Sequence, residues 1–483
     1  MPAWRSKSKS IKFKKNEPGA VAVVSDTFCN LRRNLAFLGL AVAFSIVYNI
    51  TCTPLSAASL PAGNPERCTD VSLSLRRIRR EVRGAFPNWP GYSLKIIHLG
   101  KFYPPAPGGI ETHLQTLAVS QARLGAEVRV LCVNHADRHD RDVTFSRFTP
   151  TPTRTDEDQG VPIERIGRHA SIARLDICPA LPGRLRRLMH ESADVIHLHT
   201  PNPTMMIALA ASSCRKPLVV THHSDVVRQK ILRHALTPFE RIVYGRASKI
   251  LTDSPPYLDG SVTLTRYRDK VTDLPLGIDL EPLLNPSVEV LAEADHWKRE
   301  FDGPLWLMVG RLIYYKGIDV ALHALTNVPG RLLIIGTGPL QPSMRLLAER
   351  LGVADRVTWN GHASPNVLQG AYRAATALWF PSVARSEGFG LVQVEAMASG
   401  CPVINTAISH SGVSWVSRHE ETGLTVPVKD PSAFGRAAVR LIDEPELRQR
   451  LSVRARQRAI DMFSQETMAR RSIEIYRSIT RSL

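Results

Sequence analysis

The sequence predicts an α/β protein with two doubly wound, Rossmann-like domains built on parallel sheets. At 483 residues the chain is too long for one ordinary core. Two series of short apolar runs, separated by residues 279–302, alternate with helical patterns. Unbroken apolar strands between helices are typical of a parallel sheet that is covered on both faces. Ligands in such folds lie beyond the carboxyl ends of the strands, so we expect the two sheets to face a cleft.

The position of each element follows from the apolar pattern. In the first half we expect strands at residues 95–99, 128–133, 193–198, 218–221 and 250–252 and near Val271. In the second half we expect strands at residues 306–310, 332–335, 357–359, 377–380 and 402–404. After the glycine-rich loop that ends at Gly109, apolar residues recur on one face of a helix: Leu114, Leu117, Ala118, Gln121 and Leu124.

Four segments follow along the chain. Residues 1–92 form a basic extension outside the fold, 93–285 the first domain and 286–464 the second. Each domain has an ordinary size for a doubly wound fold. Residues 279–302 show no strand pattern and are expected to be the linker. Residues 465–483 are amphipathic and predict a terminal helix.

The extension holds one nearly uncharged run, residues 35–50, which is borderline in length for a membrane span. Three interpretations stay open: a membrane-association element, an export signal, or an extension that results from a start site assigned too early. The net charge of +18 favours an anionic partner. The basic arm lacks interleaved aromatic residues, which argues against nucleic acid and leaves peripheral membrane contact open.

Cysteine usage indicates a reducing compartment. The chain has seven cysteines, an odd number, and no pair is spaced for a disulfide framework or a zinc site. Cys132, Cys214 and Cys401 lie in or beside apolar or small-residue segments and are expected to be buried. We therefore expect a cytoplasmic protein, with the cytoplasmic face of a membrane as the alternative.

Two segments of the second half carry the chemistry. Arg311 and Lys316 directly follow a strand and place two cations at the mouth of the sheet. A departing diphosphate gains negative charge, and fixed cations stabilise it without a metal ion. Further along, Glu387-Gly388-Phe389-Gly390-Leu391 leads into a helix that carries Glu395. The amides at that helix start suit an oxyanion, and the two carboxylates suit sugar or ribose hydroxyls. The alternatives are two solvated surface cations for Arg311 and Lys316, a helix-capping role for Glu387, and a solvated Glu395.

In this order and spacing, these segments resemble glycosyltransferase family 4, the retaining enzymes of the two-domain GT-B fold. The resemblance covers residues 95–483. Thr221-His222-His223-Ser224-Asp225 and Gly412-Val413-Ser414-Trp415 are similar to a subset that includes mannosyltransferases of bacterial surface polysaccharides. The first domain would then hold the acceptor and the second the nucleotide sugar.

The resemblance also implies site residues. Arg311 and Lys316 would grip the donor diphosphate, Glu387 would contact the transferred sugar, and Glu395 the ribose. His223 would lie near the reacting carbon, with His222 as a weaker candidate. The remaining implied donor-binding positions are Gly108, Gly109, Gly336, Phe389, Gly390 and Leu391. Leu276 departs from the family, in which many members have Asn.

The predicted activity is transfer of a hexose, with mannose favoured, from a nucleoside-diphosphate sugar to a glycan or lipid-linked acceptor in polysaccharide or lipopolysaccharide biosynthesis. GDP-mannose is the favoured donor, followed by a UDP-hexose, and no cofactor or metal is expected. The front-face attack of a retaining mechanism is implied by the family. The alternatives are a GT-B sugar-nucleotide epimerase and a non-enzymatic basic nucleic-acid binder.

Three other signals are set aside. Asp156-Glu157-Asp158 fits a metal-binding D-x-D but is expected in a solvated loop. Gly336-Thr337-Gly338 has Gln341 where a dinucleotide fingerprint needs its third glycine, so a sugar-nucleotide contact fits this segment better than NAD. His197 and His199 alternate on one strand, but no carboxylate or third metal ligand is expected nearby, so a role at the edge of the cleft or in the core is favoured.

Overall fold

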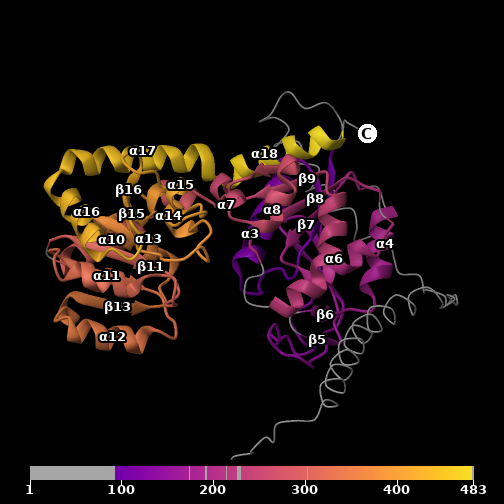
Figure 1. Ribbon diagram of the computed structural model, residues 1–483, viewed down its shortest axis with the longest axis horizontal. Coiled ribbons are helices and arrows are strands. Elements are labelled where there is room, and N and C mark those ends of the chain that lie inside the picture. Colours follow the sequence, from indigo (N-terminus) through magenta and orange to yellow (C-terminus); the bar gives the residue numbers. More distant parts are fainter. Residues whose placement is uncertain are drawn as a thin grey trace, which may run out of the picture. The chain divides into compact units, whose positions relative to one another are not determined.

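The computed structural model describes residues 93–172, 175–190, 193–213, 215–225, 230–301 and 303–480. It shows the expected two α/β domains (Figure 1). Residues 1–92, with the apolar run 35–50, lie outside the described residues, as does Cys214. The predictions about the extension therefore remain predictions.

The first domain is an eight-stranded sheet in the order β10-β9-β8-β7-β1-β2-β4-β3. Its strands are β1 (Lys95–Leu99), β2 (Glu127–Val133), β3 (Arg154–Asp158), β4 (Val161–Ile166), β7 (Val195–Thr200), β8 (Leu218–His222), β9 (Lys249–Thr252) and β10 (Val271–Asp273). All pairs are parallel except β3 with β4, which is antiparallel at the edge. A separate hairpin consists of β5 (Ala170–Ile172) and β6 (Leu175–Ile177).

The helices of the first domain are α3 (Gly109–Arg123), α4 (Leu181–His190), α5 (Pro203–Ala210), α6 (Lys230–Arg246), α7 (Pro255–Asp259) and α8 (Val262–Arg266), with a short 3₁₀ turn at Arg268–Lys270. Both faces of the sheet are covered. Ile97 and Leu99 of β1 pack into one hydrophobic core, and Ile96 packs into the other. This is why the strands read as continuous apolar runs.

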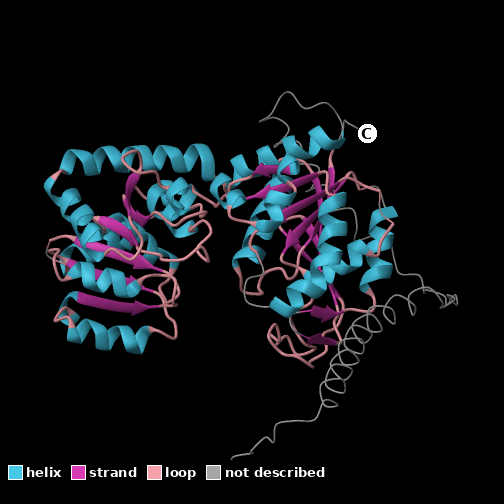
Figure 2. Cartoon of the chain, in the orientation of Figure 1, coloured by secondary structure: helices cyan, strands magenta, loops and turns pink. Residues whose placement is uncertain are grey.

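The second domain is a six-stranded parallel sheet in the order β13-β12-β11-β14-β15-β16. Its strands are β11 (Leu305–Val309), β12 (Arg331–Ile335), β13 (Val357–Gly361), β14 (Ala377–Phe380), β15 (Val403–Thr406) and β16 (Gly423–Val426). Figure 2 shows helices flanking these strands. They are α9 (Glu281–Leu284), α10 (Val288–Glu300), α11 (Ile318–Leu325), α12 (Gln341–Arg350), α13 (Pro365–Ala374), α14 (Leu391–Ala398), α15 (Val413–Val416), α16 (Pro431–Asp443) and α17 (Pro445–Phe463), with a 3₁₀ turn at Ala354–Arg356.

Several expectations need correction. The sequence interpretation missed β3, β4, β5, β6 and β16. Residues 156–158 lie in β3 and not in a loop, although Asp156 and Glu157 are exposed as expected. Asp156 pairs with Arg165 of β4, and Asp158 accepts hydrogen bonds from Tyr103 and Gln115. The expected linker at 279–302 contains α9 and α10, whose Leu283 and Trp297 belong to a core of the second domain.

The terminal helix α18 (Gln465–Thr480) is present, and it packs against α3 of the first domain. Figure 1 shows α18 in yellow beside that domain. Its buried Met468, Ile473 and Tyr476 share a hydrophobic core with β1 and α3. The chain end therefore completes the first domain, which the amphipathic pattern alone did not indicate.

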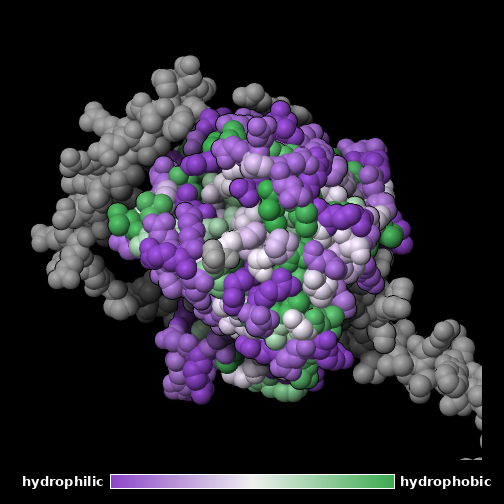
Figure 3. Space-filling model, turned by 90° about the vertical axis from the view of Figure 1, so that its left-hand side faces the viewer, coloured by the Kyte–Doolittle hydropathy of each residue, from purple (hydrophilic) through white to green (hydrophobic). Residues whose placement is uncertain are grey.

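The surface of the second domain in Figure 3 is mostly hydrophilic, with apolar residues in small, scattered groups. No helix in the described part of the chain is long and apolar enough to cross a membrane. Cys132 and Cys401 are buried, as expected, and so is Cys178.

Candidate active site

A tight loop after β11 positions Lys316. Gly317 ends this loop with φ +66, and a Cβ there would lie 2.0 Å from the carbonyl oxygen of Pro381. Only glycine tolerates both conditions, so it lets the loop close against the segment after β14. The amide of Val383 donates a 2.8 Å hydrogen bond to the carbonyl of Tyr315, which fixes the two segments together.

This closure brings Lys316 against Glu387. The Lys316 Nζ atom lies 2.6 Å from a carboxylate oxygen of Glu387, and the two side chains are only 12% and 11% exposed. The hydroxyl of Ser382 donates a 3.3 Å hydrogen bond to the same carboxylate. Nζ also lies 5.0 Å from the ring centroid of Phe380. The two predicted site residues are therefore in direct contact. The alternative of a solvated cation does not hold for Lys316, and the N-cap of α14 is Gly390 and not Glu387.

Arg311 lies on the same loop and is exposed. It interacts with the hydroxyl of Tyr315, whose pKa is raised mainly by burial, so this phenol stays neutral. The loop thus presents one exposed guanidinium and one buried ammonium beyond the end of β11. An anion at this position would meet both cations.

The next predicted segment forms the start of α14. Gly390 precedes the helix with φ +79, and a Cβ there would lie 2.7 Å from the ring of Phe380. Phe389 is buried, and Leu391 is the first residue of the helix. The first amides of a helix have no carbonyl one turn earlier to bind, so they point at the space before α14. The Ser411 hydroxyl holds the carbonyl of Glu387 at 2.5 Å.

Glu395 lies farther along α14 and is largely enclosed. The hydroxyl of Tyr372 donates a 2.7 Å hydrogen bond to its carboxylate. Burial raises the pKa of Glu395 above its ordinary value, while the Tyr372 hydrogen bond acts in the opposite direction. Glu395 is therefore a held carboxylate and not a solvated one. Sequence reasoning did not find Tyr372, because it lies on α13 and shares no motif with Glu395.

The predicted glycines allow close approach of backbone. Gly336 has φ +142, and a Cβ there would lie 2.0 Å from the carbonyl oxygen of Gly310, which brings the ends of β11 and β12 together. In the first domain, Gly108 caps α3 and Gly109 is its first residue. Space around Gly109 is open, since a Cβ there would meet nothing within 4 Å.

His223 follows β8 in the first domain and is half-buried. Its Nε2 lies 3.3 Å from Nδ1 of His199. His222 differs, because its Nδ1 lies 2.7 Å from the Tyr244 hydroxyl and its Nε2 lies 3.2 Å from Asp225. Both ring nitrogens of His222 are occupied, so of the two predicted histidines His223 is the one with a ring nitrogen left for a ligand.

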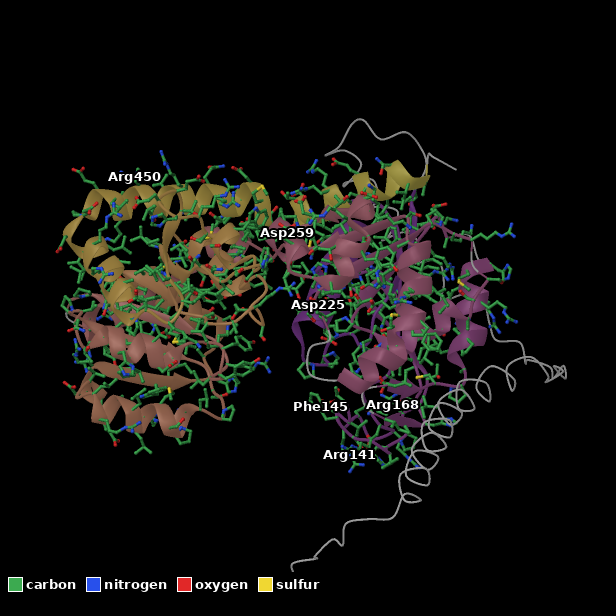
Figure 4. All side chains as sticks on the ribbon, in the orientation of Figure 1. Arg141, Phe145, Arg168, Asp225, Asp259 and Arg450 are labelled. Atoms are coloured by element: carbon green, nitrogen blue, oxygen red, sulfur yellow. The ribbon has the colours of Figure 1, made fainter. Side chains whose placement is uncertain are left out.

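An ion pair connects the loop of His223 with the loop of Glu387. Arg385 donates a 3.1 Å hydrogen bond to Asp225, which Figure 4 labels, and another of 3.1 Å to the carbonyl of Tyr257. Burial alone would raise the pKa of Asp225, but hydrogen bonds from His222 and Ser261 and the charge of Arg385 lower it to about 2. This ion pair was missed, since nothing in the sequence pairs residues so far apart.

One expectation about histidines was wrong. His197 and His199 do have further imidazoles nearby, in two groups of three whose ligand atoms lie within 4.8 Å of one another. One group adds His98, and the other joins His199 to His113 and His223. Their strands and helix bring them together from distant parts of the chain, so spacing along one strand could not predict the cluster.

Comparison with known proteins gives matches to both domains. The family model described as Glycosyltransferase Family 4 matches residues 107–282, and the model described as Glycosyl transferases group 1 matches residues 292–458.

The chain is also similar to individual proteins over most of its length. D-rhamnosyltransferase WbpZ of Pseudomonas aeruginosa is 30% identical over 379 residues, which cover 77% of this chain and 92% of that protein. O-antigen chain mannosyltransferase C of Escherichia coli is 27% identical over 393 residues, which cover 80% of this chain and 100% of that protein. Among solved structures, Anabaena HepE in complex with UDP aligns with a TM-score of 0.63 at 19% identity, over 80% of this chain and 100% of that one.

Proposed function

This chain belongs to glycosyltransferase family 4 and has the GT-B fold, and we propose that it transfers a hexose, with retention of configuration, from a nucleoside-diphosphate sugar to a glycan or lipid-linked acceptor. GDP-mannose is the favoured donor. The name of one relative, a mannosyltransferase, supports this choice, whereas another relative is named as a rhamnosyltransferase. The relatives also support a role in polysaccharide biosynthesis.

The observation that carries the proposal is the Lys316–Glu387 pair, held 2.6 Å apart beside the start of α14. Before the donor binds, Glu387 balances the charge of Lys316. A diphosphate in front of Arg311 and the α14 amides would share Lys316, and its negative charge grows as the glycosidic bond breaks. These groups are fixed before reaction, so they stabilise the leaving group without reorganisation.

Glu387 would then bind hydroxyls of the transferred sugar, and Glu395 those of the ribose. The acceptor hydroxyl is the nucleophile, and it attacks from the face on which the phosphate departs. The leaving phosphate takes the proton of that hydroxyl. Arg311, Lys316 and the amides of α14 would stabilise the negative charge of the leaving diphosphate, so we propose that transfer needs no metal ion.

The experiment starts with a thermal-shift panel of GDP- and UDP-sugars on the full chain. A ligand at 100 times its dissociation constant stabilises by about 2.7 kcal/mol, which such a panel detects. The best donor is then incubated with lipid-linked glycan acceptors, and NMR reads the anomeric configuration of the product. We expect GDP-mannose to give the largest shift and a product with the configuration of the donor.

Two variants connect the activity with the site. Lys316→Met should abolish most of the transfer, and Lys298→Met serves as the matched control, because Lys298 is 57% exposed on α10. An inverted product would exclude the retaining mechanism. Equal activity of the two variants would exclude the site.

A further inference from the structure

Five histidines gather around β1, β7, β8 and α3 of the first domain: His98, His113, His197, His199 and His223. The first four are buried, and His223 is half-buried. Burial lowers the pKa of His98 to about 4 and that of His113 to about 3, and it holds the pKa of His199 and His223 well below the ordinary value. All of these rings are therefore neutral near pH 7. A neutral imidazole has one N–H donor and one acceptor nitrogen, so each ring transmits a hydrogen bond in one direction.

The direction of these hydrogen bonds is set at the C-terminal helix α18. The hydroxyl of Ser472 donates its only proton to the carbonyl of Ala469 at 2.7 Å. Its oxygen must therefore accept from Gln121, whose amide nitrogen lies 2.7 Å away. The same nitrogen lies 3.3 Å from the hydroxyl of Tyr476. Two contacts thus fix the orientation of the Gln121 amide, and its carbonyl oxygen faces the other way.

From Gln121 the direction of hydrogen bonding is fixed in turn at the imidazole rings of His98, His199 and His223. The Gln121 carbonyl lies 2.7 Å from Nε2 of His98 and can only accept, so Nε2 of His98 carries the proton. Nδ1 of His98 is then an acceptor, and it lies 3.0 Å from Nε2 of His199, which must donate. Nδ1 of His199 in turn accepts from Nε2 of His223 at 3.3 Å. The ring planes of these last two histidines differ by 15°, which suits a hydrogen bond in the plane of both rings.

We propose that Gln121, His98 and His199 are positioning residues, which form a one-way hydrogen-bond relay from α18 to His223 and hold Nδ1 of His223 as an acceptor for a substrate hydroxyl. Among the described residues, Nδ1 of His223 has no hydrogen-bond partner. The relay places the ring proton of His223 on Nε2, so a group that binds at Nδ1 must donate a hydrogen bond.

His113 supplies the complementary group. Its ring centroid lies 4.8 Å from that of His223, and neither of its ring nitrogens has a hydrogen-bond partner in the described part of the chain. A neutral, buried His113 must carry one N–H without an acceptor, which is costly. A hydroxyl both donates and accepts, so one hydroxyl could satisfy His223 and His113 together. This step rests on the proposed function, in which both the donor sugar and the acceptor bring hydroxyls.

A metal ion is the competing occupant of the same rings. Bound to His113, His199 and Nε2 of His223, it would need the lone pair of the nitrogen that the relay protonates. The two arrangements are therefore mutually exclusive, and the position of the protons distinguishes them.

The test is solid-state NMR of the full chain labelled with ¹⁵N-histidine, which reports directly which ring nitrogen is protonated. Single His→Asn variants assign the signals of His98, His199 and His223 among the 16 histidines. We expect all three to carry the proton on Nε2. The measurement needs no donor, so its result stands even if the proposed transfer activity fails. A protonated Nδ1 on His223, or metal bound at one equivalent through Nε2 of His223, would overturn the relay.

Variants of Gln121 test the direction. Gln121→Met removes the fixed acceptor, and we expect part of the His223 signal to move to the form protonated on Nδ1. Gln121→Glu keeps an acceptor toward His98 and should restore the original form. Gln115→Met is the matched control, because Gln115 is on the same helix and bonds to Asp158 outside the relay. If Gln121→Met and Gln115→Met give the same His223 spectrum, the relay does not set the tautomer.

Ligand additions identify the hydroxyl. A shift of the Nδ1 signal with GDP-mannose but not with GDP assigns the hydroxyl to the donor sugar. A shift that needs the glycan acceptor assigns it to the acceptor. If neither addition moves the Nδ1 signal, the proposed hydroxyl site on His223 is wrong.

Discussion

Lys316 and Glu395 lie near the same predicted donor but would meet parts of it that behave differently during reaction. In the proposed function Lys316 would face the diphosphate, which gains charge in the transition state. Glu395 would face the ribose, which does not change. Interactions that strengthen only in the transition state raise turnover, whereas constant ones contribute to binding alone. The two side chains should therefore affect different kinetic constants.

We expect Lys316→Met to lower saturated turnover about 10- to 100-fold, since a charge-assisted contact contributes roughly 1.5–3 kcal/mol. Donor affinity should fall less. Glu395→Ala should mainly weaken donor binding. The measurements are the donor dissociation constant by calorimetry and the saturated rate. The scheme fails if Glu395→Ala abolishes turnover at unchanged affinity while Lys316→Met changes neither constant.

Glu395 also predicts a pH dependence. Burial raises its pKa, so the carboxylate takes up a proton at a higher pH than an exposed glutamate. The protonated form loses the charge that favours two ribose hydroxyl donors. Donor affinity should therefore be constant at neutral pH and decrease as the pH falls through the raised pKa. Glu395→Gln should bind more weakly at neutral pH and lose this acid limb. A titration of donor affinity against pH checks this, and an unchanged acid limb in Glu395→Gln would assign the titration to another group.

At the scale of elements, α18 connects the chain end with the first domain. Tyr476 is fully buried there, and its hydroxyl lies 2.6 Å from Nδ1 of His197. Nε2 of His197 lies 2.6 Å from the hydroxyl of Thr221 on β8. The terminal helix thus bonds to β7, which contains His199, and through His197 to β8, which directly precedes His223. Its role therefore extends beyond covering apolar surface.

Tyr476→Phe keeps the ring in its core and removes only the hydroxyl. We expect a loss of about 1–2 kcal/mol in the free energy of unfolding, because buried polar partners are left unsatisfied. Tyr314→Phe is the control, since Tyr314 is 54% exposed, and should change stability by less than about 0.5 kcal/mol. Urea unfolding of both variants measures the difference. Equal stabilities would mean that the Tyr476 hydroxyl does not hold α18 in place.

At the scale of the whole molecule, the sequence predicted most of the central strands, and it missed elements at the edges. β7 and β11 are buried on both faces and read as apolar runs. β4 lies next to the edge strand, and Pro162, Glu164 and Arg165 interrupt its apolar residues, while β3 contains no apolar residue. Cross-strand partners such as Arg165 stabilise β3, and no local pattern shows them.

In the candidate site, too, the sequence revealed residues in local motifs and missed the contacts between distant parts of the chain. Lys316, Glu387 and Glu395 lie in local motifs, so the sequence revealed them. Tyr372 as the partner of Glu395, the Arg385–Asp225 pair and the histidine relay join residues that are tens to hundreds of positions apart. Such contacts depend on strand order and helix packing, which motif spacing does not encode.

The described fold begins at Ser93, just before β1. The Ser93 hydroxyl donates a 2.9 Å hydrogen bond to the carbonyl of Gly125. We expect a chain that starts at Ser93 to fold and to bind donor with the affinity of the full chain. Calorimetry on both proteins checks this. If the shorter chain is insoluble or does not bind while the full chain does, residues 1–92 contribute to the fold.

The most direct measurement of the central claim is the rate of GDP release from GDP-mannose in the presence of acceptor and excess EDTA. It compares the wild type with Lys316→Met and Lys298→Met. We predict that the wild type and Lys298→Met turn over at the same rate under EDTA, and that Lys316→Met is slower by at least about tenfold. Loss of wild-type turnover under EDTA that magnesium or manganese restores, or a Lys316→Met rate equal to that of Lys298→Met, would contradict metal-independent transfer at the Lys316–Glu387 pair.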